Sequence, residues 1–230
     1  MKNYFSKHYA AINDIDIHDK NSLKQWYSQQ STHYDRELLP YVGDLRGKRV
    51  LEAGCGIGGL LYYLKQSGVE NFFGIDISEE QISIARQYVT DRLKECDVSE
   101  FLASKKETYD CIIMYDLIEH IKKESIIPLI GYIYAALAEN GVVIIRTPNM
   151  GSRTGLYSRY IDFTHETGFT EESIKQVFSQ YPFREVAVYD AYIGRKRKFI
   201  VSLHRHLLKK IYNVRLSSVV TPNLIGIARK

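Results

Sequence analysis

The chain has 230 residues, of which 45% are hydrophobic and 25% are charged, a composition typical of a globular protein long enough for one complete domain. Its three scattered cysteines, Cys55, Cys96 and Cys111, exclude a disulfide framework and indicate a reducing compartment. The amino terminus lacks the apolar core of a signal peptide, and no run approaches ~18 apolar residues, so we expect a cytoplasmic chain without a membrane-spanning helix.

Polar and aromatic residues dominate the first 45 positions. Two short helices are predicted there, at residues 22–30 and 33–39, with a break around Ser31 and Thr32. Pro40 then marks the approach to the first strand.

A glycine-rich turn follows the first predicted strand, which ends in an apolar run and an acid, Glu52. Glycine tolerates positive φ and lets a ligand approach the backbone closely. Open α/β sheets bind nucleotides at such turns, where the N–H groups of the next helix face an anionic group. Gly54, Gly56 and Gly59 match the G-x-G-x-x-G pattern of dinucleotide sites. Glu52, Gly54, Gly56 and Gly58 match the acid-x-G-x-G-x-G pattern of S-adenosylmethionine (SAM) methyltransferases.

Acidic residues follow the second and third predicted strands. Residues 71–76 end in Asp76, whose carboxylate can accept both hydroxyl groups of a ribose. Because SAM and NAD both carry this ribose, Asp76 does not distinguish them. The third strand, near residues 92–96, leads into Asp97 and Val98. There a carboxylate can accept a hydrogen bond from an adenine amino group, and the Val98 N–H can face the ring.

Strands and helices alternate from residue 47 to residue 146. A helix is predicted at residues 79–90, a fourth strand at 109–114, and a further helix after Lys123 that stops at Asn140-Gly141. Alternating units of this kind predict a mostly parallel sheet with helices on both faces.

With these motifs in place, the chain resembles the class I SAM-dependent methyltransferases, in particular the group that includes ubiquinone-type O-methyltransferases. The resemblance covers about residues 35 to 190. It is carried by seven short motifs: Glu52 to Gly58, Gly74 to Ser78, Cys96 to Val98, Tyr109-Asp110, Asp116 to His120, Glu139 to Gly141, and Thr147 to Asn149. It implies a Rossmann-like seven-stranded mostly parallel sheet with helices on both faces. NAD binding, and a turn that binds no ligand, are the alternatives.

The resemblance also implies one methyltransferase domain over residues 1–230. Residues 1–45 would form a helical cap, 46–190 the SAM-binding core, 191–223 a basic amphipathic insert, and 224–230 the last strand. The implied cofactor-binding residues are Glu52, Gly54, Cys55, Gly56, Gly58, Asp76, Ile77, Asp97, Val98 and Tyr115. Tyr27 and Tyr34 in the cap either touch the methionine end of SAM or pack within the fold. The product of the cofactor would be S-adenosylhomocysteine.

Two histidines are candidates for the catalytic base. SAM is already activated, so a methyltransferase mainly aligns the reacting atoms, and a hydroxyl acceptor also gains from a base such as histidine. Our hypothesis is that His165 is the base and that Asp162 orients it or binds substrate. His120, after the fourth strand, is the second candidate. The structural alternative is that His120 and His165 only brace the adjoining helix starts.

A metal site is weakly indicated. Asp116, Glu119 and His120 stand at i, i+3 and i+4 and would share one face of a helix. In ubiquinone-type O-methyltransferases a similar segment is linked to a divalent cation, but Asp116 has a shorter reach than the glutamate usual there. We therefore expect no functional metal.

The tail differs in charge from the rest of the chain. Residues 191–230 hold ten Lys and Arg and no acid, whereas the remaining 190 residues hold 21 Lys and Arg against 27 Asp and Glu. Strands are predicted at 184–190 and 224–228. The insert between them carries an apolar stripe at Ile200, Leu203, Leu207, Ile211 and Val214. Such a helix suits an anionic membrane, a phosphate-bearing substrate or a partner subunit, or its stripe packs on the sheet edge. We expect no nucleic-acid partner, since no recognised motif is present.

Together these features predict a SAM-dependent O-methyltransferase. The Asp162-x-Thr-His165 loop resembles that of methyltransferases acting on sugars, so the leading acceptor is a sugar hydroxyl or phosphate oxygen of a bacterial surface glycolipid or polysaccharide intermediate. The basic insert would bring the enzyme to the inner face of the membrane. The alternatives are a small-molecule O-methyltransferase for a phenol or quinone precursor, and a non-catalytic SAM-binding module. The oligomeric state is not predicted.

Overall fold

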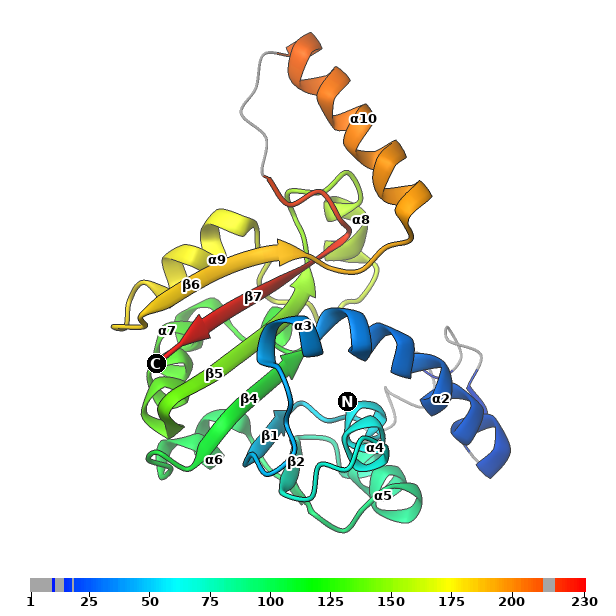
Figure 1. Cartoon of the computed structure of the whole chain (residues 1–230), viewed down its shortest axis with the longest axis vertical. Helices are drawn as coiled ribbons and strands as arrows, with labels where there is room; N and C mark the ends of the chain where they lie inside the picture. The colour runs from blue at the N-terminus through cyan, green and yellow to red at the C-terminus, as the bar shows by residue number, and fades with distance from the viewer. Residues whose placement is uncertain (1–9, 11–14, 18, 213–217) are drawn as a thin grey trace.

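The computed structural model describes residues 10, 15–17, 19–212 and 218–230, which include a seven-stranded sheet (Figure 1). Its strands are β1 (Val50–Ala53), β2 (Phe72–Asp76), β3 (Leu93–Glu95), β4 (Tyr109–Tyr115), β5 (Leu137–Pro148), β6 (Glu185–Asp190) and β7 (Asn223–Arg229). The order is β3-β2-β1-β4-β5-β7-β6, with β7 antiparallel to both of its neighbours and the other pairs parallel. The predicted fold class is confirmed.

Helices cover both faces of this sheet. They are α2 (Lys20–Glu37), α3 (Leu39–Val42), α4 (Gly59–Gln66), α5 (Glu79–Tyr88), α6 (Val98–Ala103), the 3₁₀ helix η2 (Ile118–His120), α7 (Lys123–Ala136), α8 (Gly155–Tyr160), α9 (Glu171–Phe178) and α10 (Arg195–Tyr212). One apolar cluster joins the sheet to α2, α4 and α5, and a second joins it to α6, α7 and α9. The central strands are therefore buried on both sides, and all four residues of β1 are buried.

The amino-terminal helices differ from the prediction. Instead of two helices broken around Ser31 and Thr32, a single helix, α2, runs through both residues and is capped by the Asp19 carboxylate. Ser31 and Thr32 are tolerated within a helix, and the helix ends only before the short α3, in which Pro40 occupies an early position.

The predicted stop of α7 at Asn140-Gly141 is also wrong. The helix ends at Ala136, and β5 begins at once with Leu137, which pairs with Tyr109 of β4. Asn140 has a positive φ of 62° and lies where the register of β5 against β4 shifts. The Asn-Gly pair therefore marks an irregularity inside a strand instead of a helix end.

The predicted insert contains α10, which lies between β6 and β7 and extends away from the sheet (Figure 1). Its apolar stripe does not pack on the sheet edge, because Ile200, Leu203, Leu207 and Ile211 are exposed. Val214 falls outside the described residues. Among the described residues, no helix has both the length and the hydropathy needed to cross a bilayer.

Candidate functional site

The carboxyl ends of β1, β2 and β4 converge on the glycine turn. Gly54, Gly56 and Gly58 have φ values of 75°, 52° and 86°, so each takes a left-handed conformation that other residues adopt only with strain. A Cβ on Gly54 would also lie 3.1 Å from the Leu117 side chain. The turn therefore requires glycine for both its dihedral angles and its packing.

Asp76 ties this turn to the end of β2. Its Oδ2 accepts a hydrogen bond from the Gly56 N–H at 2.9 Å, and its Oδ1 accepts one from the Ser78 N–H at 2.8 Å. Burial raises the pKa of Asp76, while these N–H donors oppose the shift. Each carboxylate oxygen can accept a second hydrogen bond, so a ribose could be held from the same position.

The acidic residue after the third strand already accepts hydrogen bonds from the backbone. Asp97 is the N-cap of α6, and its Oδ1 accepts hydrogen bonds from the N–H groups of Ser99 at 2.7 Å and Glu100 at 3.1 Å. Val98 is buried in the first turn. Next to Asp76, Ile77 leaves 72% of its surface exposed, which offers an apolar surface to a flat ring. The adenine contacts of Asp97 and Val98, and cofactor binding by Ile77, stay predictions.

Three buried polar atoms lack a hydrogen-bond partner within the described part of the chain. One is Arg146 Nε, which still forms an ion pair with Glu37 at 3.2 Å, and the other two are Glu52 Oε2 and the Tyr115 hydroxyl. Glu52 is aligned with Ile113 across β1 and β4, so Glu52 and Tyr115 project from the same face of the sheet. Burial, together with nearby Asp76, raises the pKa of Glu52 well above its ordinary value. Unpaired buried polar atoms are costly, so these two fit a cofactor that supplies hydrogen-bonding groups.

Cys55 supports the turn through its backbone N–H and its buried side chain. Its N–H donates to Ile75 O at 2.9 Å, and its side chain is buried. Burial also raises the pKa of the Cys55 thiol. Cys55 therefore anchors the turn to β2 and is not a reactive thiolate.

Residues of helix α2 contact the glycine turn. The Tyr27 hydroxyl donates to Ile57 O at 2.8 Å, and Trp26 and Tyr34 leave no room for a side chain on Gly59. The Tyr34 ring lies 6.1 Å from that of Tyr115, centroid to centroid. Tyr27 thus fixes the turn by packing and hydrogen bonding, and the ring of Tyr34 lies near the ring of Tyr115.

His120 and His165 lie together, with ring centroids 4.9 Å apart. His120 ends η2, directly after β4, and His165 belongs to the loop between α8 and α9. This loop is joined to η2 by the N–H groups of Glu166 and Thr167, which donate to Glu119 O at 2.7 and 3.0 Å. The structure therefore brings the two predicted histidines to one place, at the carboxyl edge of the sheet.

Hydrogen bonds fix the protons of both rings. His165 Nδ1 lies 2.8 Å from Ser158 O, a carbonyl that can only accept, so Nδ1 carries the proton. His120 Nδ1 lies 3.2 Å from Thr164 O and 2.9 Å from Thr164 Oγ1, whose own proton goes to Asp162 at 2.6 Å. In the neutral state each ring therefore carries its lone pair on Nε2.

Asp162 braces His120 through Thr164, and its predicted role in orienting His165 or binding substrate stays a prediction. Its carboxylate accepts hydrogen bonds from the Thr164 N–H at 2.8 Å and the Thr164 hydroxyl at 2.6 Å, and that hydroxyl lies 2.9 Å from His120 Nδ1. The Asp162 carbonyl also accepts a hydrogen bond from the His165 N–H at 3.3 Å. Burial, and then the nearby His165, lower the pKa of His120. Sequence analysis did not identify the roles of Thr164 and Ser158. The Asp-x-Thr spacing could have indicated the role of Thr164. The role of Ser158 leaves no signal in the sequence, because only its backbone carbonyl takes part.

The structure does not bring together the three residues of the predicted metal site. Asp116 does not share a helix face with Glu119 and His120, because it has a positive φ of 51° before η2 and forms an ion pair with Arg146 at 2.6 Å. Glu119, His120 and His165 instead place ligand atoms within 4.8 Å of one another. Burial, and then Asp116, raise the pKa of Glu119 well above its ordinary value, and its carboxylate accepts from Thr147 Oγ1 at 3.0 Å. A cation bound there would have to displace the proton that burial favours on Glu119.

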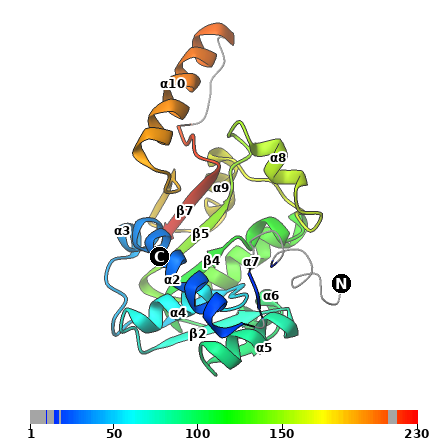
Figure 2. The same ribbon diagram turned by 90° about the vertical axis from the view of Figure 1, so that its right-hand side faces the viewer.

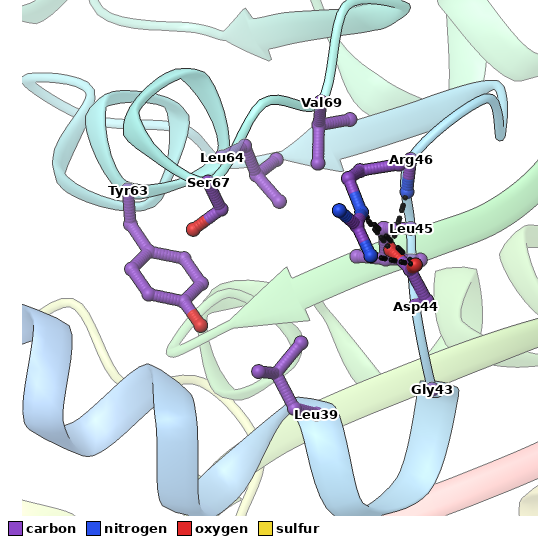
Figure 3. A pocket seen from close by; sticks show the side chains of 9 residues that line it. All are labelled: Leu39, Gly43, Asp44, Leu45, Arg46, Tyr63, Leu64, Ser67 and Val69. Atoms are coloured by element: carbon purple, nitrogen blue, oxygen red, sulfur yellow. Dashed lines mark hydrogen bonds and ion pairs between the residues drawn. The ribbon is translucent and has the colours of Figure 1, made fainter.

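A separate surface pocket of about 380 Å³ lies away from this site (Figure 3). Its lining includes Leu45 and Val69, which precede β1 and β2, so it lies at the amino ends of the strands. Arg46 on its rim is already paired with Asp44 at 2.6 Å. We do not assign this pocket to the candidate site, which forms at the opposite edge of the sheet.

Comparison with known protein families agrees with the site's geometry. A family model described as a methyltransferase domain matches residues 21–188, which is more than half of the chain. A crystal structure of a SAM-dependent methyltransferase from Archaeoglobus fulgidus superposes with a TM-score of 0.72 at 22% identity, over 89% of this chain and 94% of that one. This likeness establishes the fold.

Curated relatives match over shorter stretches. A ubiquinone biosynthesis O-methyltransferase from Neisseria meningitidis is 35% identical over 92 residues, which is 36% of this chain and 39% of the relative. A magnesium-protoporphyrin O-methyltransferase from Synechocystis is 32% identical over 110 residues, which is 46% of this chain and 47% of the relative. The chain thus spans less than half the length of these two relatives.

The hydrogen bonds at the histidine pair predict its tautomers. In neutral solution we expect His120 and His165 to carry their proton on Nδ1, as seen in ¹H–¹⁵N correlation spectra of the ring nitrogens. Thr164→Val removes the hydroxyl that accepts from His120, so the His120 signals should shift toward the Nε2–H form. Thr167→Val, which removes a neighbouring hydroxyl bonded to Ile121 O, should leave them unchanged. Nε2–H tautomers on both wild-type rings would contradict this geometry.

Proposed function

The chain belongs to the methyltransferase domain family, and we propose that it binds SAM at the glycine turn and transfers the methyl group to an oxygen of a small-molecule acceptor, a phenol or a quinone precursor. The observation that carries the choice of oxygen is the pair His120 and His165. Both rings have Nδ1 held by acceptors, so Nε2 can take a proton from a hydroxyl group.

The relatives favour this small-molecule alternative over the sugar or phosphate acceptor. The Neisseria and Synechocystis proteins are named as O-methyltransferases for ubiquinone biosynthesis and for magnesium-protoporphyrin. The sugar interpretation rested on the loop from Asp162 to His165 and on the basic insert. In the structure, Asp162 and Thr164 of that loop have a local explanation, because they brace the ring of His120.

The glycine turn and its neighbours would hold the cofactor. Asp76 offers a ribose acceptor, Glu52 Oε2 and the Tyr115 hydroxyl are buried oxygen atoms without a hydrogen-bond partner among the described residues, and Ile77 offers an apolar surface. When bound, SAM supplies an electrophilic methyl group on a positively charged sulfur. Glu52 and Asp76 add negative potential near that site when they are ionised.

The residues of the chain then perform two tasks. The turn and the helix α2 above it fix the orientation of the donor, because transfer requires acceptor oxygen, carbon and sulfur in line. His120 or His165 accepts the hydroxyl proton on Nε2 as the oxygen–carbon bond forms and the carbon–sulfur bond breaks. The products are the methyl ether, S-adenosylhomocysteine and an imidazolium that returns its proton to solvent.

Cofactor binding tests the first part of the proposal. Asp76→Ala should weaken SAM binding by about a hundredfold, measured by isothermal titration calorimetry, since a bidentate charged contact to the ribose is lost. The matched control is Asp110→Ala, which removes an acid at the amino end of β4 that pairs with Arg49. Its SAM affinity should stay at the wild-type level. Wild-type affinity in Asp76→Ala, or no SAM binding by the wild type, would refute this assignment.

Turnover tests the second part, with a catechol such as 3,4-dihydroxybenzoate as the acceptor probe. Replacing the base, by His165→Gln or His120→Gln, should lower kcat by about 10²–10⁴ with unchanged SAM affinity. His206→Gln, an exposed histidine on α10, is the control and should retain full activity.

The pH dependence identifies which histidine is the base. A protonated ring cannot accept a proton, so activity falls as the pH drops through the pKa of the base. Because burial lowers the pKa of His120, a rate controlled by His120 should fall only below the usual histidine range near ~6.5. His120→Gln should then remove this acid limb from its residual activity. Near-normal turnover in both His→Gln variants would exclude the histidine pair as the base.

A further inference from the structure

Helix α10 exposes an apolar face that nothing in the described structure covers. Ile200, Leu203, Leu207 and Ile211 recur at helical spacing and so lie along one side of the helix. Together with Phe199 they leave between 48% and 70% of their surfaces exposed. An apolar helix face ordinarily packs on a core, so this one requires another explanation.

A second exposed apolar segment lies in and after α8. Five large side chains there leave between 51% and 93% of their surfaces exposed: Leu156, Tyr157, Tyr160, Ile161 and Phe163. Three of the five are aromatic, a residue type that lies readily at a boundary between water and an apolar phase. These residues adjoin the loop that carries His165.

The two segments project from the same end of the molecule. Figures 1 and 2 show α8 and α10 beyond the carboxyl edge of the sheet, on the side away from β1 and α5. The Arg153 guanidinium, just before α8, lies 2.5 Å from His204 Nδ1 on α10, which joins the two elements. They can therefore meet one extended surface together.

The charge of α10 indicates the chemistry of the surface that it would contact. Residues 195–212 contain seven Lys and Arg and no acid, whereas residues 1–190 carry six more acids than bases. Lys196, Arg197 and Lys210 are exposed along with the apolar face. A helix with exposed apolar residues, in which every charged residue is Lys or Arg, matches an anionic bilayer, where apolar side chains enter the acyl boundary and cations meet lipid phosphates.

We propose that α10 and the exposed segment from Leu156 to Phe163 dock the protein on an anionic phospholipid bilayer. Docking would bring the His165 loop to the lipid surface, since Phe163 precedes His165 by two residues. This last consequence rests on the proposed function, whereas docking itself does not and is measured without turnover.

Other occupants fit the observations less well. A symmetric dimer that pairs the α10 helices of two copies would set one basic helix against another with no acid in either helix, and like charges oppose such contacts. A nucleic acid would satisfy the cations but would leave the apolar stripe in water.

Co-sedimentation with lipid vesicles tests the proposal. The full chain should sediment with phosphatidylcholine vesicles that contain phosphatidylglycerol and should stay in solution with phosphatidylcholine alone. The triple variant Lys196→Gln, Arg197→Gln, Lys210→Gln should bind the anionic vesicles on the order of a hundredfold more weakly. The double variant Leu203→Ser, Leu207→Ser should also lose binding, because the apolar term is removed while all charges remain.

A matched control removes the same charge elsewhere. Lys24, Lys48 and Lys106 are exposed and lie outside α8 and α10, so changing all three to Gln should leave vesicle binding at the wild-type level. Far-UV circular dichroism and thermal melting of every variant establish that the fold is kept. Three results would overturn the proposal: no binding of the wild type to anionic vesicles, equal loss in the control variant, or a stable dimer that Leu203→Ser, Leu207→Ser dissociates.

Discussion

The hydrogen bond from the Gly56 N–H to the Asp76 carboxylate is the constraint on which the site depends. It joins a left-handed glycine turn to the end of the neighbouring strand, and so fixes where the backbone of the turn lies. Tyr27 secures the same turn from α2 through Ile57 O. With the turn held from two sides, Glu52 and Tyr115 stay buried with unpaired polar atoms, a cost that a bound cofactor would relieve.

A second set of bonds positions the histidines. The loop after α8 is anchored on the backbone of Glu119, and each histidine ring is held through Nδ1. Burial, and then the neighbouring His165, lower the pKa of His120, so its neutral ring is favoured. The nearby Arg146 is occupied by Asp116 and Glu37, so its charge is largely balanced by carboxylates. In our proposal, this arrangement accepts a proton from a neutral hydroxyl.

Much of this arrangement could be predicted from local sequence. The order of strands and helices, Asp76 at the end of β2, and Ser78 as a helix cap follow from patterns within a few residues of each other. Ser31 and Thr32 were misjudged because tertiary packing of α2 on the glycine turn overrides weak local preferences. Asp116 was misplaced because its partner, Arg146, lies on another strand. The route from Asp162 through Thr164 to His120 likewise depends on a loop folding back over η2, which no local pattern specifies.

The most direct test of the central claim, methyl transfer from SAM to a small-molecule oxygen, follows labelled methyl from SAM into fractionated extracts of the source cell. The pools to separate are lipid, polysaccharide, protein, nucleic acid and small molecules. Our account predicts label in the small-molecule pool, as a methyl ether of a phenol or quinone precursor. Label confined to polysaccharide, protein or nucleic acid, or no label at all despite SAM binding, would contradict it.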